Sequence, residues 1–170
     1  MEEPWLRGPI AGVHAMLAPV LYTFQQARED LARHTAGMSD DQLWTVPQDG
    51  GSVGFHLRHM AGSTDRLMTY LQGLELGEEQ MAALEAEGQA DGAGRAELLA
   101  ELDGAFGRAE AIVRALDPAT LAEGRTVGRK HLPTTVIGLL THIAEHIQRH
   151  MGATIVLARA VRGSRVSAAQ

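Results

Sequence analysis

Apolar residues recur at helical spacing along four separate stretches of this chain of 170 residues. The four stretches cover about residues 12–34, 53–74, 95–116 and 134–162. Positions three and four apart lie on one face of a helix, so each stretch predicts an amphipathic helix with a buried side. In the last stretch, for example, the predicted buried stripe consists of Val136, Leu139, Leu140, Ile143, Ile147, Met151 and Ile155.

The ends of these helices carry recognisable start and stop residues. Ser52 is the expected N-cap of the second helix, after Asp49-Gly50-Gly51, and Thr134 or Thr135 that of the fourth. Pro19 lies inside the first stretch and predicts either a kink or a second helix start. The third helix is expected to stop at Asp117-Pro118, because a residue before proline avoids helical geometry.

The segments between the helices read as turns and one long crossover. Residues 75–94 are acidic and then rich in Gly, Ala and Asp, which predicts a surface crossover with one short helix at about 78–85. Residues 39–41 predict a polar turn, and residues 117–133 a loop. No segment alternates with period two for long enough to predict a strand. We therefore expect an all-α four-helix bundle in one domain over 1–170, with its core at about 10–162 and a frayed tail at 163–170.

Composition narrows the classes of function. Hydrophobic residues make up 45% of the chain and charged residues 21%, which is typical of a globular protein. There is no cysteine, which excludes disulfides, a protein thiol nucleophile and thiolate metal ligands. The net charge is −6 and no basic stripe is present, so nucleic acid is not an expected partner. No apolar leader or run of ~20 apolar residues is seen, and we expect a cytoplasmic protein that acts on a small molecule without a membrane partner.

Histidines form two clusters on separate predicted helices. His56 and His59 lie on the second helix, and His142, His146 and His150 on the fourth. Two histidines four residues apart lie on one helix face, about 6 Å apart along the axis, which suits two imidazoles that bind one ion. A third histidine from a facing helix gives the common three-ligand site with an open position. The sequence therefore predicts a metal site.

Helix phase selects among these histidines. His142 and His150 are about 12 Å apart along the axis, which is too far for one ion. Measured from the buried stripe, His150 lies at about 60°, His146 at about 100° and His142 at about 140°, so His146 and His150 form the inner pair. On the second helix the same measure mildly favours His56 over His59, and both stay open as the third ligand.

Other polar groups have simpler readings. We expect His14, His34 and His131 to be ordinary hydrogen-bonded residues, and Glu145, which points about 100° away from His146, to be solvated. A basic group precedes the fourth helix, consisting of Arg125, Arg129, Lys130 and His131. It lies roughly 20 Å along that helix from the histidine pair, so we expect a solvated basic loop and no part in the metal site.

Two segments resemble the DinB-like (YfiT-like) superfamily of metal-dependent proteins. They are SVGFHLRHMAGSTDRLMTYLQG and, later, GRKHLPTTVIGLLTHIAEHIQRHMGA. That family shows a histidine followed by an apolar residue and Ala on the second helix, and a late H-x3-H followed closely by Gly. The resemblance covers about residues 10–162. Many members end the late motif in His-Arg-Gly-Gln, whereas Met151 and Ala153 replace the Arg and Gln here.

The resemblance implies a ligand set and a class of chemistry. It places the helix-two ligand on His59, before Met60-Ala61, and the late pair on His146 and His150. It also implies a four-helix bundle with a long crossover between the second and third helices, a divalent metal such as zinc or nickel, and a homodimer. Characterised relatives include transferases and isomerases that use a low-molecular-weight thiol.

Three functions remain open at this point. The first is an S-transferase that activates a low-molecular-weight thiol on the metal; in a chain without cysteine, the thiol has to be a small molecule. The second is a metal-dependent hydrolase that uses metal-bound hydroxide. The third is a metal-binding, stress-related protein without catalysis. The chain lacks the carboxylate base that a His-Glu-x-x-His helix supplies, which favours the thiol reading.

Overall fold

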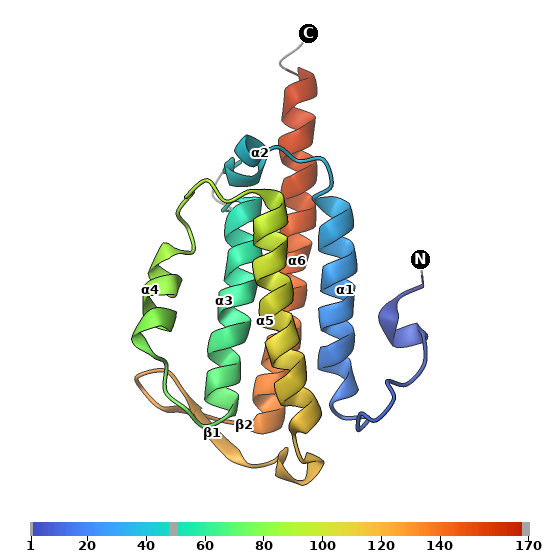
Figure 1. The fold of residues 1–170 in the computed structure, drawn as a ribbon, viewed down its shortest axis with the longest axis vertical. Helices are drawn as coiled ribbons and strands as arrows, with labels where there is room; N and C mark the ends of the chain where they lie inside the picture. Colours follow the sequence, from blue (N-terminus) through green and yellow to red (C-terminus); the bar gives the residue numbers. More distant parts are fainter. Residues whose placement is uncertain (1, 48–50, 168–170) are drawn as a thin grey trace.

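The computed structural model of the chain describes residues 2–47 and 51–167 and shows an all-α bundle with one small hairpin (Figure 1). In chain order the elements are η1 (Pro4–Leu6), α1 (Ala18–His34), α2 (Asp40–Trp44), α3 (Val53–Leu71), α4 (Glu78–Ala86), α5 (Arg95–Ala115), η2 (Pro118–Thr120), β1 (Gly124–Val127), β2 (Leu132–Thr135) and α6 (Val136–Ser167). Helices α1, α3, α5 and α6 form the bundle. The predicted fold class is confirmed.

The four bundle helices form two parallel pairs. Helix α3 packs against both α5 and α6, and α1 against α6 and α5. In Figure 1, α1 and α6 run in one direction, and α3 and α5 run in the other. Because α3 and α5 are parallel, the chain has to return along the bundle before α5 begins. The crossover between them carries the short helix α4, as the sequence predicted, and α4 lies on the outside of α3 (Figure 1).

Helix starts follow the predicted caps. The Ser52 hydroxyl accepts a hydrogen bond from the Phe55 amide at 3.0 Å and caps α3. Thr135 caps α6 in the same way by accepting from the Gly138 amide at 3.1 Å. Pro19 lies in the first turn of α1, where its missing N–H costs nothing, so it marks a helix start and not a kink.

Two short elements differ from the prediction. Residues 40–44 form a helix where a polar turn was expected, because Ser39 and Gln42 cap each other reciprocally. The predicted loop before α6 contains the antiparallel hairpin β1–β2, with Gly124 opposite Thr135. A strand of four residues is too short for the alternation of side chains between its two faces to be recognised in the sequence. The strand with which it pairs lies beyond a turn, so no local pattern indicates the pairing. The absence of strands was therefore a wrong prediction.

The boundaries of the longer helices shift by a few residues. Helix α3 ends at Leu71, three residues before the expected end, and α6 continues to Ser167, past the expected end at Arg162. Helical backbone therefore covers the first five residues of the tail predicted to fray. Asp49 and Gly50, expected just before the second helix, and the tail residues 168–170 lie outside the described residues.

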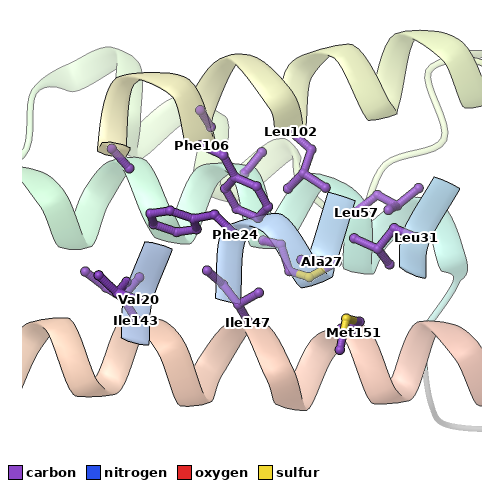
Figure 2. Close-up of a cluster of buried hydrophobic side chains, with 14 of the residues drawn as sticks. Val20, Phe24, Ala27, Leu31, Leu57, Leu102, Phe106, Ile143, Ile147 and Met151 are labelled. Atoms are coloured by element: carbon purple, nitrogen blue, oxygen red, sulfur yellow. The ribbon is translucent and has the colours of Figure 1, made fainter. Parts of the chain in front are cut away.

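The core lies along the seam where the four helices meet. Phe24 of α1 and Phe106 of α5 are fully buried and stack with their ring centroids 4.8 Å apart. Figure 2 shows these rings beside Ile143 and Ile147 of α6. The predicted α6 stripe is buried from Val136 to Met151. Among the described helices, none is long and apolar enough to cross a membrane.

Removing one of the stacked rings tests this core. Phe106→Ala is expected to lower the free energy of unfolding by about 3–5 kcal/mol, since it leaves a cavity at the centre of the bundle. Leu84→Ala on α4 is the control, because Leu84 is 39% exposed and should change stability by less than about 0.5 kcal/mol. Urea unfolding followed by circular dichroism measures both. Equal midpoints for Phe106→Ala and wild type would contradict this view of the core.

Candidate metal centre

Three histidines from two helices meet between α3 and α6. His59 lies on α3, and His146 and His150 lie one turn apart on α6. One ring nitrogen from each lies within 4.8 Å of the others, and the Nε2 atoms of His59 and His146 are 3.0 Å apart. The structure thus brings together the three residues that the family resemblance selected as metal ligands.

The histidines of α6 follow the predicted helix phase. His146 and His150 are half-buried beside the apolar stripe, whereas His142 is exposed. The Nδ1 atom of His142 lies 2.8 Å from the Glu145 carboxylate, one turn along the same helix. His142 is therefore an edge residue, outside the group of three. Glu145 is exposed, as expected, and also pairs with Arg149.

His56 has a different place from the one that helix phase alone favoured. It is 6% exposed and more buried than His59, so the phase argument was right about burial. However, its Nδ1 atom lies 2.8 Å from Nδ1 of His150, and it is not one of the three clustered residues. His56, the more buried of the two, faces the core. The nitrogens of the three clustered histidines converge at the edge of the seam between α3 and α6. His56 therefore contacts the back of a candidate ligand.

A buried carboxylate, Glu87, lies behind His59. Glu87 follows α4 on the crossover and is 3% exposed. Its Oε2 atom is 2.7 Å from Nδ1 of His59, and its Oε1 atom accepts a hydrogen bond from Arg66 at 2.6 Å. Burial by itself raises the pKa of Glu87, but the bonds from His59 and Arg66 and the Arg66 charge outweigh it and hold the pKa below its usual value.

Glu87 and Arg66 were not predicted from the sequence. Glu87 is one of several acidic residues in a segment that reads as a solvated crossover. Its partner His59 is 28 positions away, and no local pattern links the two. Arg66 offers a weak signal, since it lies seven residues after His59 and hence on the same face of the helix.

The α6 histidines are held in the neutral form. Burial lowers the pKa of His146 to about 4, helped by the nearby His59, His142 and Arg149. Burial also lowers the pKa of His150 to about 4, together with the neighbouring His146, His59 and His56. A histidine ligates a metal only when the ligating nitrogen is unprotonated. Both side chains are thus ready to bind an ion at neutral pH.

The arrangement fits a divalent ion. Two nitrogens ~2.1 Å from one tetrahedral ion are about 3.4 Å apart, and small side-chain shifts bring the present cluster to that separation. The Nδ1 atoms of His59 and His150 already have partners behind the ring. Nδ1 of His146 is buried and has no hydrogen-bond partner among the described residues. A buried nitrogen without a hydrogen-bond partner lowers the stability of the fold, so packing alone does not account for His146 at this position.

Two other features lie apart from the three histidines. A cavity of about 570 Å³ lies among α3, α4 and α5, lined by Gly62, Glu87 and Arg108 among others. It reaches Glu87 from behind and is not lined by His59. In the basic group before α6, Arg129, Lys130 and His131 are exposed at the hairpin turn, and Arg125 donates to the Leu71 carbonyl at 2.8 Å. Three of the four residues are therefore solvated, as expected, whereas Arg125 lies on β1 and has a structural role that was not predicted.

Comparison with known proteins agrees with this fold. The sequence model described as the DinB superfamily matches residues 23–153. Among solved structures, YfiT from Bacillus subtilis is similar, with a TM-score of 0.65 and 21% sequence identity, and the match covers 90% of this chain and 92% of YfiT. YfiT is described as a probable metal-dependent hydrolase with an unusual four-helix bundle topology. Comparison with curated proteins gave no match.

Alanine substitutions test the ligand set. His59→Ala, His146→Ala and His150→Ala are each expected to abolish binding of one divalent ion per chain, because each removes one of three donors. His142→Ala is the matched control on α6 and should bind normally, since His142 is exposed. Metal analysis after equilibrium dialysis gives the stoichiometry. If His56→Ala empties the site and His59→Ala does not, the ligand on α3 is His56.

The pH dependence of stability tests the buried imidazoles. Between about pH 6.5 and the folded pKa of about 4, unfolded His146 and His150 bind protons that the folded chain excludes. Unfolding of metal-free protein should therefore become easier as the pH falls through this window. In the double variant His146→Gln, His150→Gln the fall should be smaller. Urea midpoints across the window measure both proteins, and parallel curves would show that the two histidines titrate normally.

Proposed function

This chain belongs to the DinB superfamily, and we propose that it is a metal-dependent enzyme whose three histidines hold a divalent ion that activates a small nucleophile. One observation carries the proposal: nitrogens of His59, His146 and His150 converge within 4.8 Å, between two helices that the fold fixes. Zinc or nickel suits neutral imidazole ligands. When bound, such an ion keeps its full charge and lowers the pKa of a coordinated water or thiol.

The chain's own residues support two of the three histidines from behind. Glu87 accepts a hydrogen bond at Nδ1 of His59, and His56 contacts Nδ1 of His150 at 2.8 Å. The carboxylate behind His59 holds a proton at Nδ1 of that ring, so Nε2 is the nitrogen left to ligate, and His56 supports the His150 ring through its Nδ1 atom. The Phe55 ring stacks on His59 with centroids 5.4 Å apart and shields that imidazole.

Thiol transfer is the first candidate for the reaction. The carboxylate that bonds a proposed ligand, Glu87, is directed at Nδ1 of His59 and is paired with Arg66, so it is not free to act as a base. A thiol would need no such base, because a divalent ion held by the three histidines would lower the pKa of the thiol. The chain has no cysteine, so the thiol is a low-molecular-weight cofactor and the activity an S-transferase.

Hydrolysis is the second candidate, and the likeness to YfiT favours it. That protein is described as a probable metal-dependent hydrolase, and its fold is shared over most of both chains. In this reading water is the nucleophile in place of the thiol. The two reactions need the same three ligands and differ in what occupies the open position.

Cobalt substitution distinguishes the two candidates. With cobalt in the site, a low-molecular-weight thiol is expected to give an intense near-ultraviolet charge-transfer band, because the thiolate ligates the metal directly. The band should be absent from the His146→Ala and His150→Ala variants and present in His142→Ala. Transfer of the thiol to a halogenated nitroarene should then require both metal and thiol.

Other results would assign another function. Ester or amide cleavage with metal alone, with the thiol acting only as an inhibitor, would favour the hydrolase. A loaded protein that shows neither activity over a broad panel would indicate a non-catalytic metal-binding protein.

A further inference from the structure

The crossover is anchored to the bundle through Glu87. No residue of α4 is buried, yet Glu87, which directly follows α4, is 3% exposed. A buried carboxylate is costly unless it is paired and hydrogen-bonded. Both carboxylate oxygens of Glu87 have partners, His59 and Arg66, and both partners lie on α3. The crossover therefore supplies a charged group to the back of the metal centre.

We propose that Glu87 is the positioning residue for His59, and this inference rests on the proposed metal site. An ionised carboxylate accepts hydrogen bonds and donates none, so the 2.7 Å contact requires a proton on Nδ1 of His59. The ring nitrogen that remains for the metal is then Nε2, the atom 3.0 Å from Nε2 of His146. Glu87 thus fixes both the tautomer and the direction of His59.

Gly62 makes room for this arrangement. It lies on α3 between His59 and Arg66, and a Cβ atom there would lie 2.3 Å from Oε1 of Glu87 and 2.8 Å from the Arg66 guanidinium. Neither distance is sterically allowed, so any larger residue displaces the carboxylate or its partner. A helical glycine costs about 1 kcal/mol relative to alanine. At Gly62 this cost is offset by the ion pair between Glu87 and Arg66, which has room to form because glycine has no side chain.

The pair Gly62 and Glu87 gives two independent ways to disturb His59. Glu87→Gln keeps the shape but cannot accept bonds from both His59 and Arg66, so one of them loses its acceptor. Gly62→Ala removes no polar group and displaces the carboxylate by volume alone. Loss of a carboxylate behind a ligating histidine weakens metal binding by about 10–100-fold. We expect that loss in both variants.

Matched controls separate positioning from general damage. Asp91→Asn removes a carboxylate from the same crossover, one that is exposed and bonded to Arg58. Gly107→Ala adds a methyl group at an exposed position of α5, where a Cβ atom meets nothing within 4 Å. Zinc affinity, measured by competition with a chromophoric chelator, should be unchanged in both controls.

The tautomer of His59 provides a readout that does not need the metal. Long-range ¹H–¹⁵N spectra of the metal-free chain at about pH 8, above the ordinary imidazole pKa of ~6.5, should show His59 protonated on Nδ1. The controls should match the wild type. Glu87→Gln and Gly62→Ala should shift His59 toward the Nε2–H form or a mixture of both.

The results separate the positioning role of Glu87 from the proposed metal site. A wild-type His59 protonated on Nε2, or zinc affinity unchanged in both variants, overturns the role of Glu87. Zinc loss that occurs equally in Asp91→Asn also overturns it, since that indicates general damage to the crossover. If wild type binds no zinc but the tautomer changes as expected, the metal proposal fails and the positioning of His59 by Glu87 stands. If Gly62→Ala does not fold, the isosteric Glu87→Gln decides.

Discussion

The packing of α3 against α6 places the three histidines of the candidate centre. The two helices run antiparallel and bury apolar stripes that include Leu57 and Met60 on α3 and Ile143 and Ile147 on α6. Their histidines lie beside these stripes, so the register of the apolar contact also sets the register of the imidazoles. A shift of one helical turn, about 5.4 Å, would separate His59 from its partners on α6. The core thus acts as the scaffold that brings the ligands together.

The centre lies at the edge of the core, and this position has two consequences. Burial is deep enough to lower the pKa of His146 and His150 to about 4, which keeps both imidazoles neutral without excluding a ligand. Buried ring nitrogens also need hydrogen-bond partners. His56 and Glu87 supply them for His150 and His59, respectively. A cluster of imidazoles at the edge of the core is costly for stability and favourable for metal binding.

The parallel arrangement of α3 and α5 gives the crossover its role. The chain has to return along the outside of α3 (Figure 1), and this return brings Glu87 to the back of His59. A direct hairpin between two antiparallel helices would have no segment at this place. The topology therefore supplies a third structural element to a centre whose proposed ligands come from only two helices.

The sequence by itself determined the elements of local origin. Ser52 and Thr135 marked the starts of α3 and α6, and the 100° phase along α6 separated the half-buried His146 and His150 from the exposed His142. These features depend on residues within one or two turns, so the printed sequence contains the whole signal. Even there, the capping box at α2 and the short strands of the hairpin were missed, because each signal spans only about four residues.

Only the tertiary structure showed that a nitrogen of His59 converges with those of His146 and His150, and only it revealed Glu87. On α3 both histidines lie near the buried side, and helix phase favoured His56 because that measure reports burial. Which ring joins His146 depends on how α3 and α6 meet, a contact across 87 positions of sequence. Glu87 reaches His59 across 28 positions through a crossover whose path no local pattern determines. Periodicity fixes which face of a helix is buried, whereas the partner on that face is fixed by packing between distant segments.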